Sequence, residues 1–416
     1  MKKMQKILLF IFVFLIALGV ESYSYAFSPK LEKKLKLNKS SFFSDMAVHK
    51  GKLYYADVKI TNQEKDSNGN LCGGFCYVKV YEKDLKTGKN TLVNSYDSYN
   101  LSAKDISFKV LSDGNLYMIY HLGGGIMGSD FVYGLTGPNK GKNILSYNYG
   151  NFEFDKDKKS IIITPTGPWD NGNIVREMNG KIFSQTEVES YSGKYFLEKL
   201  KGEGRAFRYA DKYSALRGNT LYLTKALDKK DNFNAYDLIA FDLETESETW
   251  LAEGIHSMFM GKNALYFLRD IPTTKDIAGP QKMLYKYDLE SKETTLLSKE
   301  NNPYYDILPI DEAVFFVDAG GYYTDGKNPN LFMAKGDGSG TKKLYSNVDE
   351  VVSDGEKLAV VISNKKGTSI DFIDGHGKKL GKISVPQTHV GVFLSGDECI
   401  VWSWQNRNVN YYKLNK

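Results

Sequence analysis

The stretch MLYKYDLESKETTLLS, residues 283–298, shows how much of this chain is built. Its first part, Leu284-Tyr285-Lys286-Tyr287, alternates apolar or aromatic residues with a polar one, which is typical of a half-buried β-strand. Asp288 to Lys292 has the composition of a tight turn, and Thr294 to Leu297 begins a β-branched return strand. The stretch therefore predicts an antiparallel hairpin.

The same hairpin pattern recurs on both sides of this stretch. Further versions run from Val78 to Val93, Leu238 to Leu251, Leu331 to Leu344 and Ile370 to Leu380. Tyr and Phe are abundant, Pro is scarce, and no long run has helical spacing, so the composition favours strands throughout.

A second pattern consists of a short apolar run directly after a turn, and it occurs eight times. Its first apolar residues are Leu53, Leu116, Ile161, Leu221, Leu265, Val314, Leu358 and Ile400. The steps between them are 63, 45, 60, 44, 49, 44 and 42 residues. Most steps match a four-stranded propeller blade of roughly 40 to 50 residues, and insertions at Thr61 to Cys76 and at Glu189 to Arg208 account for the long ones. We predict an all-β fold, a single β-propeller over residues 27–416 with eight four-stranded blades; seven blades is the alternative.

The last repeat is one strand short. It offers strands at Val390 to Leu394, Cys399 to Trp404 and Val409 to Leu414, which leaves an edge that needs a partner. Residues 32–38, EKKLKLN, resemble the outer-strand sequence TKKLYSN at 341–347. We therefore expect an N-terminal clasp strand in residues 31–38 to complete the last blade. A disordered Lys-rich leader is the alternative.

Residues 1–26 have the composition of a signal peptide. Lys2, Lys3 and Lys6 precede the apolar run Ile7 to Val20, and Ser24-Tyr25-Ala26 ends in a small residue that suits signal peptidase. The run is short for a membrane span of about 20 residues, so an uncleaved anchor is the alternative. We predict a secreted protein, extracellular or associated with the cell wall, with no membrane span after signal removal.

The charge balance gives no case for nucleic-acid binding. Removal of residues 1–26 takes away three Lys and one Glu, which lowers the formal charge from +5 to +3. The remaining Lys and Arg are interleaved with Asp and Glu, and no basic stripe forms.

Three cysteines occur in the chain. Cys72 and Cys76, within LCGGFC, are a disulfide candidate for an extracellular protein, while a metal site would need further Cys or His nearby. Cys399 lies in an apolar run and is expected to be a small buried residue.

A family resemblance rests on the spelling aromatic-aromatic-x-Asp. Tyr54-Tyr55-Ala56-Asp57 and Phe315-Phe316-Val317-Asp318, with the downstream turn Tyr287-Asp288-Leu289-Glu290, resemble secreted bacterial β-propellers related to those of low-density-lipoprotein-receptor-related proteins. The resemblance extends over most of residues 31–416 and implies a propeller that binds proteins.

The connections between strands suggest where a ligand would bind. Turns between the first and second strands, and between the third and fourth, are short and share one rim. The other rim carries the long connections Val58 to Cys76, His121 to Asp130, Pro165 to Asn173, Lys225 to Asn234, Arg269 to Gln281 and Asp318 to Asn330. It also carries the links between repeats Ser95 to Asn100, Tyr147 to Tyr149, Glu300 to Tyr305 and Pro386 to His389. Binding residues concentrate on loops held by a rigid scaffold, so we place function on this long-loop rim.

Aromatic side chains beside amides, acids and Arg suit a saccharide or a peptide. The candidate ligand-binding residues on the long-loop rim are Trp169, Asp170, Tyr304, Tyr305, Tyr322, Tyr323, Trp404, Arg407, His121, His256 and His389.

Catalytic chemistry has little support in the sequence. His121, His256 and His389 fall on or near one rim but come from distant repeats, so we assign no metal. No G-x-S-x-G elbow occurs, and Asp66 to Asn70 lacks the Gly and closing Glu of a calcium loop. We assign no catalytic residue and no cofactor. The leading hypothesis is a non-catalytic propeller that binds a protein, peptide or cell-wall glycan; the alternatives are an enzyme acting on extracellular polysaccharide and a structural element of a surface assembly.

Overall fold

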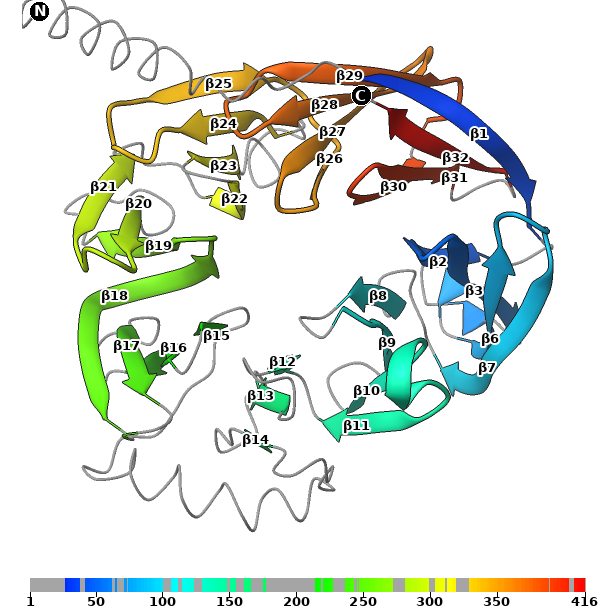
Figure 1. Cartoon of the computed structure of the whole chain (residues 1–416), viewed down its shortest axis with the longest axis horizontal. Helices are drawn as coiled ribbons and strands as arrows, with labels where there is room; N and C mark the ends of the chain where they lie inside the picture. Colours follow the sequence, from blue (N-terminus) through cyan, green and yellow to red (C-terminus); the bar gives the residue numbers. More distant parts are fainter. Residues whose placement is uncertain are drawn as a thin grey trace, which may run out of the picture.

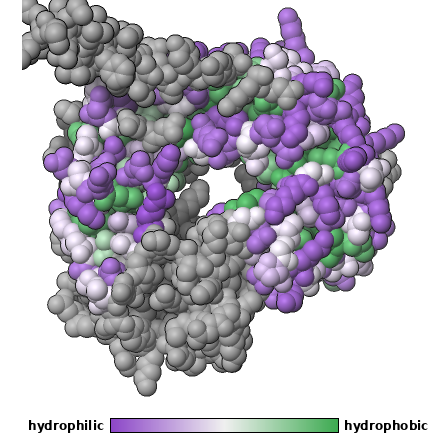
Figure 2. All heavy atoms as spheres, viewed as in Figure 1, coloured by the Kyte–Doolittle hydropathy of each residue, from purple (hydrophilic) through white to green (hydrophobic). Residues whose placement is uncertain are grey.

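The computed structural model describes residues 27–37, 42–61, 64–65, 71–72, 74–99, 106–110, 114–122, 129–147, 150–154, 161–165, 175–176, 214–217, 220–226, 236–242, 245, 247–271, 281–298, 304–310, 313–318, 329–388, 390–403 and 408–415. Within these ranges the chain is almost entirely β-strand. Antiparallel sheets follow one another around a central opening, and Figure 2 shows the same opening between the packed side chains. The ring of sheets is the β-propeller architecture.

Three sheets form the first part of the ring (Figure 1). Sheet 1 consists of β2 (Phe42–His49), β3 (Lys52–Thr61), β6 (Phe75–Asp84) and β7 (Asn90–Tyr99). Sheet 2 consists of β8 (Ile106–Val110), β9 (Leu116–Leu122), β10 (Ser129–Gly134) and β11 (Asn143–Tyr147), with the 3-10 turn η3 (Gly137–Asn139) before its last strand. Sheet 3 consists of β12 (Gly150–Phe154), β13 (Ile161–Pro165) and β14 (Val175–Arg176).

Sheet 4 is a seven-stranded sheet in which two repeats run together. Its strands are β15 (Ser214–Arg217), β16 (Thr220–Ala226), β17 (Tyr236–Asp242), β18 (Glu248–Met260), β19 (Ala264–Ile271), β20 (Gln281–Asp288) and β21 (Thr294–Ser298). The 13-residue strand β18 pairs with β17 through its first part and with β19 through its second. Gly254, with a φ of 68°, lies between the two parts. One continuous strand therefore serves as the outer strand of one repeat and the inner strand of the next.

Three more sheets follow sheet 4. Sheet 5 consists of β22 (Tyr304–Ile310), β23 (Ala313–Asp318), β24 (Leu331–Ala334) and β25 (Thr341–Tyr345). Sheet 6 consists of β26 (Glu350–Ser353), β27 (Lys357–Asn364), β28 (Gly367–Asp374) and β29 (Lys379–Val385). Sheet 7 consists of β30 (Val390–Ser395), β31 (Glu398–Ser403), β32 (Asn408–Asn415) and the N-terminal strand β1 (Ser28–Lys36). A separate ribbon is formed by β4 (Glu64–Lys65) and β5 (Leu71–Cys72).

The eight repeated apolar runs all lie in equivalent strands. Their first apolar residues fall in β3, β9, β13, β16, β19, β23, β27 and β31, each of which pairs on both sides within its sheet. Such a strand packs against a neighbouring sheet on both faces, so its sequence is apolar without alternation. In β27, for example, Leu358 to Val361 are all buried.

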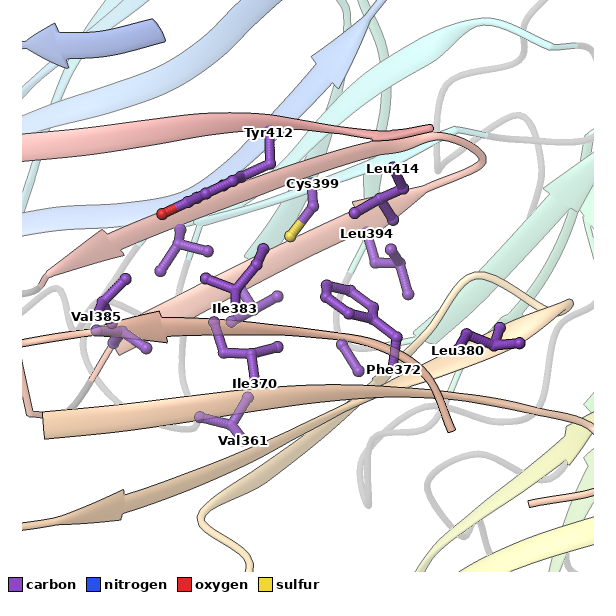
Figure 3. Close-up of a cluster of buried hydrophobic side chains, with 14 residues drawn as sticks. Val361, Ile370, Phe372, Leu380, Ile383, Val385, Leu394, Cys399, Tyr412 and Leu414 are labelled. Atoms are coloured by element: carbon purple, nitrogen blue, oxygen red, sulfur yellow. The ribbon is translucent and has the colours of Figure 1, made fainter. Parts of the chain in front are cut away.

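The core lies between neighbouring sheets. Figure 3 shows one cluster in which Ile370, Phe372 and Ile383 of sheet 6 meet Cys399 and Tyr412 of sheet 7. Phe372 and Cys399 are fully buried, and burial raises the pKa of the Cys399 thiol. Cys399 is thus a small buried residue, as the sequence predicts.

The N-terminal strand β1 pairs antiparallel with β32, from Ser28 opposite Asn415 to Lys36 opposite Asn408. The predicted clasp strand, residues 31–38, begins three residues later and ends two residues later than β1. Leu35 and Leu37 are buried in a cluster that joins sheets 1 and 7. Strand β1 therefore contacts the first sheet of the ring as well as the last.

The turn of the opening stretch recurs in atomic detail. Asp288 Oδ1 accepts hydrogen bonds from the N–H groups of Glu290 and Ser291, at 3.1 and 3.0 Å. Asp84 Oδ1 in sheet 1 accepts in the same way from Lys86 and Thr87, at 2.9 and 2.6 Å. Four residues after each Asp the backbone is left-handed, at Lys292 (φ 64°) and at Gly88 (φ 76°). These Asp residues hold the short turns that the repeats predict.

Some segments that the sequence predicts to be loops between strands are themselves β-strands in the structure. The long connection from Val58 to Cys76 contains the end of β3, the β4–β5 ribbon and the start of β6. The link from Ser95 to Asn100 lies mostly in β7. The reason is that pairing between β3, β6 and β7 continues to Thr61, Phe75 and Tyr99, although charged and polar residues interrupt the apolar pattern.

Candidate functional site

The structure describes four of the predicted ligand-binding residues, and only in their backbone. Tyr304 and Tyr305 begin β22, His121 lies in β9 opposite Asp130 of β10, and His256 lies in β18 beside a register shift. They are strand residues in sheets 5, 2 and 4 rather than loop residues, because the strand pairing extends further than the sequence predicts. Strands β18 and β22, which carry His256 and the two Tyr residues, lie next to each other where sheets 4 and 5 meet, whereas His121 lies in sheet 2. The remaining predicted residues lie outside the described residues: Trp169, Asp170, Tyr322, Tyr323, Trp404, Arg407 and His389.

The described surface shows a different aromatic site on β6. Phe75 and Tyr77 are 52% and 46% exposed, and Lys79 is exposed beside them. The alternate residues Cys76, Val78 and Val80 are buried against sheet 2. Successive side chains of a strand point to opposite faces, so Phe75, Tyr77 and Lys79 share the face that looks away from sheet 2.

The strand register identifies the neighbours of these aromatic side chains. Tyr77 lies opposite Lys59 of β3 on one side and Asp97 of β7 on the other. Directly opposed residues of paired strands share a face, with Cβ atoms roughly 4.5–5.5 Å apart. We call Phe75, Tyr77, Lys59, Lys79 and Asp97 the β6 patch. Two aromatic side chains and charges of both signs are thus held on one rigid sheet face.

The β6 patch continues a face that is buried elsewhere. Further along the same strands, Leu53 and Tyr55 pack with Ile400, Trp402 and Tyr411 of sheet 7. Toward the β3–β6 connection the face is no longer covered, and Tyr77 and then Phe75 become exposed. This end of β3 and β6 leads into the longest described connection of sheet 1, so the β6 patch lies toward the long-loop rim.

The β6 patch could not be recognised in the sequence. In the segment FCYVKV, residues 75–80, apolar residues occur at both odd and even positions, and this pattern predicts a strand that is buried on both faces. One feature of the sequence pointed to an exposed face: along the face that carries Phe75 and Tyr77, the next residue is the charged Lys79. Only the structure shows that sheet 7 leaves this end of the β6 face exposed.

The predicted Cys72–Cys76 disulfide is not formed in the structure, where Cys76 is a buried free thiol. Cys76 points into the core between sheets 1 and 2, and its Sγ lies 3.7 Å from the carbonyl oxygen of Gly74. Cys72 belongs to the separate β4–β5 ribbon, where it pairs with Glu64. The inward direction of Cys76 is the physical reason why the pairing fails here.

Asp45 is the described acid whose pKa is raised most clearly. It lies on β2, the innermost strand of sheet 1, and burial raises its pKa from 3.8 to about 6. Backbone N–H groups of Met46 and Phe108 donate to the carboxylate and limit the rise, with Met46 N at 2.9 Å from Oδ1. Phe108 lies on β8, so Asp45 links the inner strands of two neighbouring sheets.

Glu82 forms an ionic network at the opposite, short-turn end of sheet 1. Tyr54 donates to Glu82 Oε2 at 3.0 Å, and Lys140 of sheet 2 donates at 3.1 Å, while Lys52 donates to Oε1. Burial opposes ionisation of Glu82, but these hydrogen bonds together lower its pKa. The network fastens sheet 1 to sheet 2.

Other kinds of site find no support in the described part of the chain. There, no group of three or more His, Cys, Asp or Glu side chains could hold a metal ion. Among the same residues no helix has the length and apolar character needed to cross a membrane.

Comparison of the sequence with protein-family models and with curated proteins gives no match. Solved structures with similar folds include the β-propeller domain of the Trilobed protease from Pyrococcus furiosus, at 10% identity and a TM-score of 0.44, covering 91% of this chain and 97% of that one. BamB from Moraxella catarrhalis gives 10% identity and 0.45, with 92% and 97% covered. An uncharacterised protein from Listeria monocytogenes EGD-e gives 11% and 0.46, with 87% and 100% covered. At such identities the likeness concerns the fold alone.

Proposed function

We propose that this protein is a secreted, non-catalytic β-propeller of eight blades that binds a protein or peptide through its long-loop rim. The observation that carries the proposal is the pair Phe75 and Tyr77, which are 52% and 46% exposed on a rigid sheet face. A face of this kind buries aromatic area on binding without ordering a loop first, which keeps the entropic cost of association small.

The count of eight blades rests on sheet 4. Its strand β18 serves two repeats, so the seven-stranded sheet counts as two blades and the remaining six sheets as one each. The eight apolar runs at equivalent strands support the same count.

Closure of the ring is assigned to β1. This strand pairs with β32 of sheet 7, and Lys33 donates to the carbonyl oxygens of Leu85 and Lys86 in the β6–β7 turn of sheet 1. Leu35 and Leu37 are buried between the same two sheets. An N-terminal strand with contacts on the last and first sheets is suited to act as the clasp.

A protein partner fits the β6 patch better than a small ligand. Aromatic side chains are enriched in protein interfaces, and they contribute most where surrounding residues exclude water. Complete burial of the exposed halves of Phe75 and Tyr77 would contribute roughly 1–2 kcal/mol each. Lys59, Lys79 and Asp97 supply charges of both signs at the edge, where they would select among partners more than they add affinity.

Secretion and the family resemblance complete the proposal. The apolar run and small-residue end of residues 1–26 support export, and the resemblance to propellers related to those of low-density-lipoprotein-receptor-related proteins supports protein binding. Trp169, Asp170, Tyr322, Tyr323, Trp404 and Arg407 remain proposed contributors on the same rim.

The test compares a Phe75→Ala/Tyr77→Ala variant with a matched control. Leu92→Ala removes a side chain that is 51% exposed on β7 of the same sheet, close to the short-turn rim. The immobilised mature protein is incubated with culture-medium and cell-surface protein fractions, and bound proteins are quantified by mass spectrometry. We expect one partner to be retained by the wild type and by Leu92→Ala, and to be reduced at least about tenfold with the double variant.

Equal retention by both variants would remove the β6 patch from the binding site. The same proteins are applied to a glycan array and to purified cell-wall polysaccharide. Saturable binding to a glycan with no retained protein would support the saccharide reading, and release of reducing ends would support the enzyme.

A further inference from the structure

Phe27, the residue directly before β1, occupies a defined position on sheet 6. Its backbone nitrogen donates to the carbonyl oxygen of Leu380 at 2.7 Å. Its ring meets the ring of Phe372 edge-on, with centroids 5.3 Å apart and planes at 60°. Figure 3 shows Phe372 and Leu380 together at one end of the buried cluster between sheets 6 and 7, and Phe27 packs against this cluster.

The space for Phe27 depends on a glycine. A Cβ atom on Gly381 would lie 2.8 Å from the carbonyl oxygen of Phe27 and 2.9 Å from two of its ring atoms. Contacts this close require the residue to move. The absence of a side chain at Gly381 therefore lets both the backbone and the ring of Phe27 approach β29.

Phe27 is also the residue that follows the predicted cleavage site. Signal peptidase acting after Ser24-Tyr25-Ala26 would leave Phe27 as the first residue. Cleavage hydrolyses the Ala26–Phe27 amide, so the Phe27 nitrogen becomes an α-ammonium group with three N–H donors. A hydrogen bond from a charged donor to a carbonyl oxygen is stronger than one from a neutral amide.

We propose that Phe27 is the N-terminal residue of the mature protein. Its α-ammonium group and its ring are bound by a site on sheet 6 formed by Leu380, Phe372 and Gly381. Strand β1 pairs with sheet 7, so the bound terminus fastens sheet 6 to sheet 7 through the first residue of the chain. Processing by signal peptidase then creates the group that locks the last part of the ring. This inference does not depend on the binding function proposed above.

The first experiment measures the intact mass of the protein purified from the medium of a secreting host. The expected mass is that of residues 27–416. A mature chain that begins at any other residue would overturn the proposal.

The second experiment uses proteins released from a fusion by a protease that leaves residue 27 as the free N-terminus. The variants are Phe27→Ala, Gly381→Ala, the double variant, and Ser28→Ala as the control, since Ser28 is exposed and next in sequence. We expect Phe27→Ala to lower Tm by about 2–4 °C and to speed trimming by an aminopeptidase at least about tenfold, because the terminus is no longer held. Ser28→Ala should match the wild type in both assays.

The double variant separates this contact from a general loss of stability. Because Gly381→Ala acts by displacing Phe27, the double variant should melt no lower than the less stable single variant. Additive losses in Tm, or a Phe27→Ala protein that behaves like Ser28→Ala, would refute the site.

Discussion

Replacement of Asp45 by Asn tests most directly how the innermost strands of sheets 1 and 2 are linked. Asp45 lies on β2, and its carboxylate accepts N–H bonds from Met46 and from Phe108 of the neighbouring sheet. Asn has the same shape and keeps an oxygen acceptor, but it carries no charge at any pH. The substitution therefore removes the cost of burying the charge while it keeps one oxygen that can accept from the Met46 N–H.

The magnitude follows from the pKa. Burial raises the pKa of Asp45 from 3.8 to about 6, and each pKa unit corresponds to about 1.4 kcal/mol. The folded protein keeps a proton that the unfolded chain releases between about pH 4 and pH 6, so this group lowers the free energy of unfolding as pH rises through that window. The full difference is about 3 kcal/mol, and partial solvent exposure of the side chain reduces it to about 1–3 kcal/mol.

We expect Asp45→Asn to match the wild type at about pH 4 and to be more stable by about 1–3 kcal/mol above about pH 6. Urea unfolding followed by Trp fluorescence at pH 4, 5, 6 and 7 measures the difference, in which the titration of other groups cancels. Asp84→Asn is the matched control of opposite sign, because hydrogen bonds from Thr87 lower the pKa of Asp84. A stability difference for Asp45→Asn that does not change with pH, or a loss of stability at pH 7, would refute the reasoning.

Three further predictions concern the strands and turns. Lys292→Gly should stabilise the protein by about 0.5–1 kcal/mol in urea unfolding because its φ is 64°, whereas Gly88→Ala at the equivalent turn should destabilise it; the opposite signs would contradict the turn geometry. Deletion of residues 28–36 should lower Tm by several degrees because it exposes the edge of β32; an unchanged Tm in a thermal scan would exclude the clasp. The Phe75→Ala/Tyr77→Ala variant should change the free energy of unfolding by less than about 1 kcal/mol, since both side chains are already exposed; a large loss would mean that the β6 patch is buried.

The repeat could be predicted from the sequence because its strongest signal comes from strands buried on both faces. Leu358 to Val361 and Val314 to Val317 are apolar at every position, and the sheets on either side cover them. The turns at Asp288 and Asp84 could also be predicted, because a side chain that accepts hydrogen bonds within its own turn depends only on the local sequence. Signals of these two kinds do not depend on how the sheets are arranged.

The strand ends and the open surface could not be predicted. Pairing of β3 with β6 continues to Thr61 and Phe75 because each strand has the other as a partner. The local sequence does not show where such a partner strand ends. The direction of Cys76 depends in the same way on the register of β6, which places its thiol in the core between sheets 1 and 2. The merging of two repeats in β18 likewise depends on a left-handed Gly254 between two pairings.

One face of sheet 1 meets sheet 7 and strand β1 at one end and carries the β6 patch at the other. At one end, Leu53 and Tyr55 of β3 are buried against sheet 7, in a cluster that also contains Leu35 and Leu37 next to the β1–β32 pairing. At the other end, Tyr77 and Phe75 remain exposed. Loss of β1 would therefore loosen the contact that positions sheet 7 beside this face. A binding defect caused by deletion of residues 28–36, in a protein whose β6 patch is intact in sequence, would show that the pairing of β1 with β32 maintains the proposed binding surface.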